Sequence, residues 1–429
     1  PEGMCYENSW GYHYYTLSAL THMAEAGRRS GIDIYSHEML HKMYLIAFDY
    51  LMSDGSLPRF GDSVNDTPGN PAVNEMAYMA YSDDRLLFTL PSEISWDMIM
   101  SGRKADQRAS IPGTASRLIP GAGHAILATE GPGQLTAALT FGPYGGFHGH
   151  FDKLSFVFFG YGSELGVDPG RAASQAYRLP IHSEWYKATT GHNAILADGE
   201  SQKEAEGKLI SYAASPLYAA VAADAGPAFE KVNHRRFLLL APEYLLVVDE
   251  LNSLDGKEHT FDWLYHNKGI KTYCNLTPGA ATTGNAPAGY TYLKDIDAFK
   301  VGKEKFTEIR FQGDQINTRL IMAVKNGDEV FTATGPLASV TDRAPMAIVR
   351  RKGDKVLFAS AIEPVPADKE SDIRSIELVH EDTLEIIIGR ASGTDRIKFG
   401  GKSPGDFKVF SRSGSSAEQI VLDSATGEK

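Results

Sequence analysis

Three histidines and one aspartate in the middle of the chain have residue types and a spacing that suit a metal site. His148 and His150 lie in a Gly-rich turn, and residues two apart in an extended segment face the same side. Asp168 ends one apolar run and His192 comes directly before another, so three strand ends can meet at one point. Two histidines and a carboxylate form a competent Zn²⁺ ligand set. Spacing alone leaves a structural role open for each histidine.

The elements that would position these residues change in type along the chain. Helical spacing of apolar residues predicts helices over residues 9–29, 37–52, 72–80 and 94–101. Beyond residue 115, short apolar runs alternate with turns, which predicts antiparallel sheets of the sandwich type. We therefore expect an α+β multidomain chain. Its parts would be an α-helical domain over 1–105, a central β-sandwich over 106–340 and a smaller C-terminal β-sheet domain over 341–429.

Composition and charge exclude some classes of function. The formal net charge is −12, whereas a nucleic-acid binder needs a basic surface. An acidic protein can still carry a local Arg/Lys cleft for a polyanionic sugar. The sequence has no apolar run of about 18 residues, as a membrane-spanning helix requires. The two cysteines, Cys5 and Cys274, lie far apart and indicate no disulfide framework. We expect no nucleic-acid and no membrane partner, and the oligomeric state stays open.

Two stretches of the chain resemble the signature of the heparinase II/III-like polysaccharide lyases, a group that includes heparinases and several alginate lyase families. They are HGHFDKLSFVFFGYGSELGVDPG and WYKATTGHNAILADG. The opening motif MCYENSWGYHYYTLSALTHMAEAGRR resembles a helix of the α/α toroid in that family. The resemblance covers about residues 1–270. It implies an incomplete N-terminal α/α toroid followed by antiparallel β-sandwich domains, an anionic polysaccharide as substrate, and a periplasmic or secreted location.

The resemblance also implies a role for individual residues. The metal ligands would be His150, Asp168 and His192, holding one structural Zn²⁺. The catalytic residues would be His148, Tyr177 and Asn8. Substrate-binding candidates are Glu7, His13, Arg59 and Arg178. One departure concerns the catalytic tyrosine that the family carries on its toroid, because the matching segment RFGDS has Phe60 there. The general acid is therefore not fixed by the resemblance.

The implied reaction is β-elimination of a uronic-acid polysaccharide, either alginate or a glycosaminoglycan. Such a reaction needs a group that neutralises the uronate carboxylate, a base for the C5 proton and an acid for the leaving oxygen. Glycoside hydrolases need instead two carboxylates that flank the bond. Asp152 and Asp168 are the pair available, and Asp168 is better explained as a metal ligand. The alternatives are a zinc-dependent glycan hydrolase and a catalytically silent carbohydrate-binding protein on the same fold.

Overall fold

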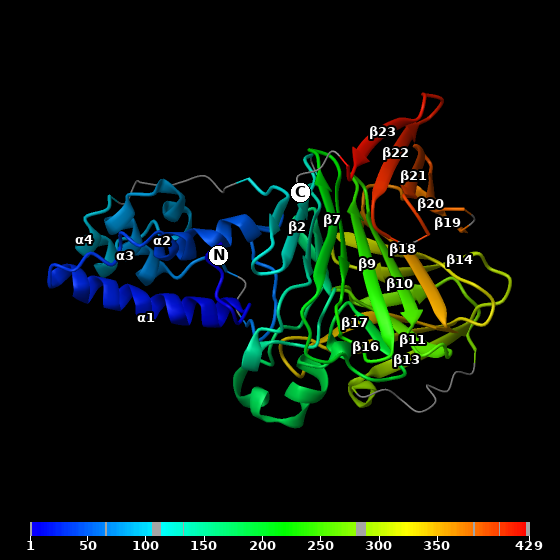
Figure 1. Cartoon of the computed structure of the whole chain (residues 1–429), viewed down its shortest axis with the longest axis horizontal. Helices are drawn as coiled ribbons and strands as arrows, with labels where there is room; N and C mark the ends of the chain where they lie inside the picture. Colours follow the sequence, from blue (N-terminus) through cyan, green and yellow to red (C-terminus); the bar gives the residue numbers. More distant parts are fainter. Residues whose placement is uncertain are drawn as a thin grey trace.

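The computed structural model describes residues 2–64, 67–104, 113–131, 133–279, 289–380, 382–402 and 404–425. Helices come first, namely α1 (Trp10–Arg29), α2 (Glu38–Leu45), α3 (Pro71–Tyr81) and α4 (Trp96–Ser101). Antiparallel sheets follow, so the predicted fold class is confirmed (Figure 1). The predicted boundary at residues 105–106 lies outside the described residues. None of the described helices is long and apolar enough to cross a membrane.

Within the described ranges, the strands form four sheets, which we number here. Sheet 1 contains β1 (Arg117–Ile119), β2 (His124–Ala128), β3 (Thr136–Thr140), β4 (Phe156–Gly160) and β5 (Ser163–Gly166). Sheet 2 has the order β12 (Lys271–Cys274), β14 (Phe306–Gln312), β15 (Ile316–Ala323), β18 (Lys355–Pro366), β10 (Leu245–Ser253), β9 (Val232–Leu240), β8 (Ala219–Asp224) and β7 (Lys208–Ala214).

The remaining strands complete the sandwich and add a C-terminal sheet. Sheet 3 has the order β13 (Lys294–Lys300), β16 (Glu329–Pro336), β17 (Arg343–Gly353), β11 (His259–His266) and β6 (Ile195–Ala197). Sheet 4 contains β19 (Ile373–His380), β20 (Leu384–Arg390), β21 (Gly393–Phe399), β22 (Phe407–Ser413) and β23 (Gln419–Asp423). Since β17 and β18 belong to sheets 3 and 2, the last sheet begins at Ile373. The sheet pairing thus corrects the predicted boundary at residue 341.

Strands that are apolar on both faces show how the helices and sheets are stacked in layers. In β4, Phe156 and Phe158 join the core between sheets 1, 2 and 3, while Val157 and Phe159 join the core under the helices. Successive residues of a strand face opposite sides, so a strand covered on both faces is apolar at every position. The helical domain therefore covers the outer face of sheet 1. Sheet 4 covers the outer face of sheet 2 in the same way.

A buried ionic centre ties the sandwich together. The Asp249 carboxylate on β10 accepts hydrogen bonds from His234 Nε2 at 2.7 Å, Arg236 Nε at 2.7 Å and Trp263 Nε1 at 3.0 Å. Arg236 also donates to the backbone oxygens of Leu154 and Asn193. Burial alone would raise the pKa of Asp249, but the Arg236 charge and the hydrogen bond from His234 outweigh it and lower that pKa to about 2.

We expect Asp249→Asn to lower the free energy of unfolding by about 3–5 kcal/mol, because it leaves the buried Arg236 charge without its counter-ion. The depressed pKa means that this stabilisation is present above the unfolded-state pKa of about 4 and is lost as the pH falls toward 2. Urea unfolding at pH 7 and at lower pH measures both effects. Asp224→Asn, at the partly exposed pair with Arg235, is the matched control and should cost about 1 kcal/mol or less. Equal losses in the two variants would contradict the prediction.

Candidate active site

The loop over residues 59–63 fixes the segments that carry the candidate site residues. Ser63 Oγ accepts a hydrogen bond from the backbone N–H of Trp10 at 3.0 Å and so caps α1. Asp62 N donates to His148 O at 3.0 Å, and Arg171 N donates to Ser63 O at 3.1 Å. Gly61, at φ +52, has no room for a side chain, because a Cβ would lie 2.7 Å from His148 O. One short loop thus holds the start of α1 and two distant segments together.

His148 is held from two sides by the first residues of the chain. Its Nδ1 lies 2.7 Å from Glu7 Oε1, and its ring stacks on Tyr12 with ring centroids 3.4 Å apart. A histidine whose Nδ1 is engaged by a carboxylate has its Nε2 fixed in direction. The His148 side chain stays 17% exposed. His148 is therefore oriented rather than buried.

Tyr177, in the 3₁₀ turn Ser174–Arg178, lies among cations. Its Oη accepts a hydrogen bond from Arg178 Nε at 2.9 Å, and the Arg171 guanidinium lies 5.0 Å from its ring centroid. Arg171 Nη1 donates to Tyr12 Oη at 3.4 Å, which links this turn to the ring that stacks on His148. Among the described residues, the buried Nε of Arg171 has no hydrogen-bond partner. Tyr177 and His148 thus belong to one connected group.

Behind this group lie two buried histidine–carboxylate pairs. His150 Nε2 is 3.0 Å from Asp62 Oδ1, and His192 Nδ1 is 2.7 Å from Asp168 Oδ2. The His150 and His192 ring centroids are 5.2 Å apart. Burial disfavours both charges of the second pair, but their mutual attraction prevails and lowers the pKa of Asp168 while raising that of His192. The three predicted ligands are therefore neighbours in space.

These residues suit a zinc ion by their chemistry, although their side chains are paired with one another. His150 Nδ1 and His192 Nε2 are buried and have no hydrogen-bond partner among the described residues. A buried imidazole nitrogen without a partner is costly unless a further group binds it. Within the described ranges, no group of three or more His, Cys, Asp or Glu side chains stands ready around one ion position. The donor set fits zinc, and zinc binding stays a prediction.

The structure contradicts two of the predicted substrate contacts. His13 is fully buried in the face of α1 that packs in the core, where Nδ1 accepts from Cys5 N and Nε2 lies 3.0 Å from Met43 O. Burial lowers the pKa of His13 to about 4, so it is a neutral core residue. Arg59 pairs with Glu164 and donates to Asp168 O at 2.9 Å. The Arg59 guanidinium therefore binds other parts of the protein and is not positioned to bind a substrate.

Other predicted residues take different places. Glu7 contacts His148, so it positions that ring. The Asn8 side chain is buried and donates to Ala122 O at 3.4 Å, and its substrate contact stays a prediction. Arg178 is exposed beside Tyr177. Phe60 is buried and stacks on His124 with ring centroids 4.4 Å apart, so this position presents no acid or base to the site.

Four further residues complete the group and were not among the predicted site residues, namely Tyr12, Asp62, Arg171 and His182. Tyr12 and Arg171 join His148 to Tyr177. His182 lies between Tyr177 and Asp62. The ring centroids of His182 and Tyr177 are 6.5 Å apart, and His182 Nε2 lies 3.5 Å from Asp62 Oδ1. Helical spacing could have indicated that Tyr12 lies off the buried stripe of α1. Nothing local in the sequence marks Asp62, because its partners lie more than 80 residues away.

Comparison with known proteins identifies the family of the chain. The sequence model described as Heparinase II/III-like, C-terminal matches residues 111–336, which is more than half of the chain. A second model, described as Alginate lyase, matches residues 1–56. The chain therefore belongs to the heparinase II/III-like family of polysaccharide lyases. The two matched ranges contain every residue of the group around His148 except the loop over residues 59–63.

Solved structures and a curated relative point to the same group of proteins. Heparinase III superposes with a TM-score of 0.68 at 14% identity, covering 99% of this chain and 60% of that one. Heparan sulfate lyase HepC from Pedobacter heparinus superposes with a TM-score of 0.64 at 14% identity, and the match covers 100% of this chain and 60% of that one. Exo-oligoalginate lyase from Saccharophagus degradans is 29% identical over 140 residues, or 28% of this chain and 19% of that protein. The chain thus spans about 60% of the matched structures' length and less of the curated relative.

Proposed function

We propose that the protein cleaves a uronic-acid polysaccharide by β-elimination, with His148 and Tyr177 as the proton-transferring residues. The observation that carries the proposal is that His148, fixed by Glu7, and Tyr177, fixed by Arg178, belong to one group around Arg171. The names of the relatives, heparan sulfate lyase and exo-oligoalginate lyase, support an acidic polysaccharide as substrate. An extracytoplasmic location, where such polymers occur, is part of the same proposal.

The proposed roles follow from the hydrogen bonds of each side chain. With its Nδ1 proton donated to Glu7, His148 has a lone pair on Nε2 and acts as the base that removes the C5 proton. Arg171, whose guanidinium lies between Tyr12 and the Tyr177 ring, neutralises the uronate carboxylate and so acidifies that proton. A phenol oxygen that accepts from Arg178 still has its own proton to give, so Tyr177 protonates the leaving oxygen. The C4–O bond breaks as the C4–C5 double bond forms.

A direct test measures the new double bond. Elimination creates an unsaturated uronate that absorbs in the ultraviolet, whereas hydrolysis at a metal-activated water creates only reducing ends. We expect a rise in absorbance with at least one of alginate, heparan sulfate, chondroitin sulfate and hyaluronan. Reducing ends without absorbance would indicate a hydrolase, and binding without either product would indicate a carbohydrate-binding protein. Each of these two results would overturn the proposal.

Bound zinc would be held by His150, Asp168 and His192. It would have a structural role there, because it would link the three segments that carry these ligands. We expect about one zinc ion per chain when the protein is purified without chelator. Removing the ion with EDTA should lower the melting temperature, because a ligand that binds the folded state stabilises it by linkage. Metal analysis and calorimetry measure the two quantities. His150→Ala should lose the metal, and an unchanged metal content in that variant would contradict the ligand assignment.

A further inference from the structure

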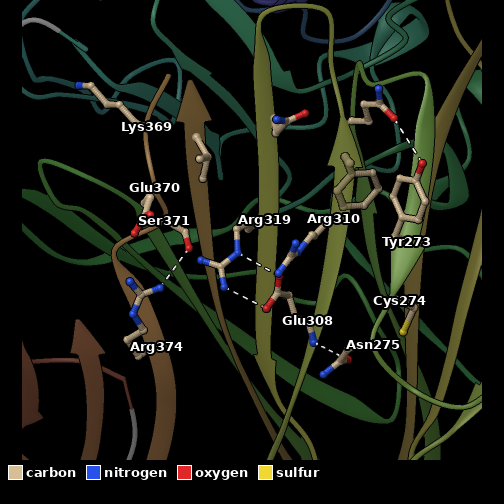
Figure 2. A pocket seen from close by; sticks show the side chains of 14 residues that line it. Tyr273, Cys274, Asn275, Glu308, Arg310, Arg319, Lys369, Glu370, Ser371 and Arg374 are labelled. Carbon is tan, nitrogen blue, oxygen red and sulfur yellow. Dashed lines mark hydrogen bonds and ion pairs between the residues drawn. The ribbon is translucent and has the colours of Figure 1, made fainter. Parts of the chain in front are cut away.

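A hollow of about 790 Å³ lies on the outer face of sheet 2, along the edge formed by β12, β14 and β15. The opposite wall is formed by the connection from β18 to β19, which includes Lys369 and Ser371, and by Arg374 at the start of β19 (Figure 2). This volume lies in the range of small-ligand sites, about 300–1,000 Å³. None of its lining residues belongs to the group around His148. Figure 1 shows β14 at the end of the sandwich away from the helices.

Strand register builds the floor of the hollow. Tyr273 on β12 lies opposite Arg310 on β14, and Arg310 lies opposite Arg319 on β15. Ile309 and Phe311 point into the core between the sheets, so the intervening Arg310 points outward. The three outward side chains therefore form a row across neighbouring strands, as Figure 2 shows.

The row holds two arginines side by side, which costs energy unless a carboxylate separates them. Glu308 supplies that carboxylate, because it accepts hydrogen bonds from Arg319 Nε at 3.0 Å and Nη2 at 2.9 Å, and from Arg310 Nε. Arg319 also pairs with the buried Glu363 and is only 10% exposed, whereas the Arg310 side chain is 64% exposed. The buried arginine is thus compensated within the protein, and the exposed one presents its guanidinium to the hollow.

The remaining lining residues add an aromatic face, amides and further cations. Tyr273 is 48% exposed, and its Oη donates to Gln312 Oε1 at 3.4 Å. The exposed charges of the lining are three cations, Arg310, Lys369 and Arg374, and one carboxylate, Glu370. On a chain of net charge −12, this is a local basic patch. Aromatic faces pack on apolar C–H groups, amides such as Asn275 and Asn317 bind hydroxyls, and guanidinium groups bind carboxylates.

We propose that this hollow is a second, non-catalytic binding site for an acidic oligosaccharide. A sugar ring would lie on Tyr273, its hydroxyls would contact the amides, and its carboxylate or sulfate would pair with Arg310 and Arg374. The class of ligand rests on the proposed function, whereas the site rests on its own residues. A polymer bound here stays attached to the protein between cleavage events, because the site is separate from His148.

Calorimetry with a mannuronate hexasaccharide tests the site without turnover. The parent is the full chain carrying His148→Ala, and the test variant adds Tyr273→Ala and Arg310→Gln. We expect the test variant to lose one binding event per chain, and each single change to weaken that event by about fivefold or more. Arg412→Gln, at an exposed arginine on β22 outside the hollow, is the matched control and should leave binding unchanged. Far-ultraviolet circular dichroism and melting temperature check the fold of every variant.

Additional ligands and an activity assay identify the class of ligand and distinguish this proposal from the catalytic one. A heparan sulfate hexasaccharide tests sulfated against carboxylate-only sugars, and a neutral dextran oligosaccharide of equal length should not bind. In the protein with His148 intact, Tyr273→Ala should raise KM for polymeric alginate several-fold and leave cleavage of a trisaccharide unchanged. Unchanged stoichiometry and affinity in the test variant, relative to its His148→Ala parent, would overturn the second site, as would equal binding of dextran. A failure of the catalytic proposal would appear instead as absent elimination.

Discussion

Replacing His148 with alanine is expected to reduce the rate of elimination by about 10²–10⁴-fold, the usual contribution of a positioned acid or base. The imidazole is 17% exposed, is held by Glu7 Oε1 at 2.7 Å, and stacks on Tyr12. The substitution removes the imidazole and leaves the backbone hydrogen bond from Asp62 N to His148 O. The melting temperature should therefore change little. Ultraviolet absorbance at saturating polysaccharide measures the loss in kcat.

Glu7→Gln is the companion variant for His148. It keeps the size of the side chain but weakens the acceptor that orients the ring, so we expect a loss smaller than that of His148→Ala and mainly in kcat. His41→Ala provides the control, because His41 pairs with Asp83 on the helical domain outside the site. Activity near that of the unmodified protein in His148→Ala would show that another group removes the proton.

Tyr177→Phe removes a single oxygen and is expected to lower kcat by about 10²–10⁴-fold if the phenol protonates the leaving oxygen. The ring contacts with Arg171 and His182 remain in the variant, and only the hydrogen bond from Arg178 is lost. We therefore expect metal content and melting temperature to stay near their original values. A substrate with an activated aryl leaving group should be affected much less, because such a group departs without a proton.

Tyr186→Phe is the matched control for this variant. Tyr186 is buried nearby and donates to Leu337 O, so its oxygen faces the protein and not the site. This change should affect stability more than kcat. If Tyr177→Phe eliminated at a near-unchanged rate, Tyr12, which stacks on His148, would become the next candidate for the acid.

The elements of the fold could be predicted because their signals are local. The apolar period indicated both the helices and the strands, and the strand ends placed His150, Asp168 and His192 near each other. The helical period also indicates the place of His13, because His13 lies three residues after Trp10 and four before Leu17, on the buried face of α1. Helical periodicity alone would have assigned His13 to the core.

The contacts that complete the site could not be predicted, because they join distant parts of the chain. Arg59 meets Glu164 across 105 residues, and Asp62 meets His150 across 88. The fate of a surface arginine or aspartate depends on which loop folds against it, and no periodic pattern encodes that. The pairing of β18 with β10 and β15 is equally nonlocal, so the sequence alone does not show that a domain boundary at residue 341 would divide sheets 2 and 3.

The position of β18 has a consequence for the order of folding during synthesis. This strand lies between β10 and β15, so it is the piece that joins two half-sheets made from earlier sequence. Until residues 355–366 leave the ribosome, both half-sheets present an open edge of unpaired backbone groups, which is a template for aggregation. A chain that ends at residue 340 would keep both edges open permanently. Such a fragment should collect in the insoluble fraction, although it would contain every residue of the group around His148.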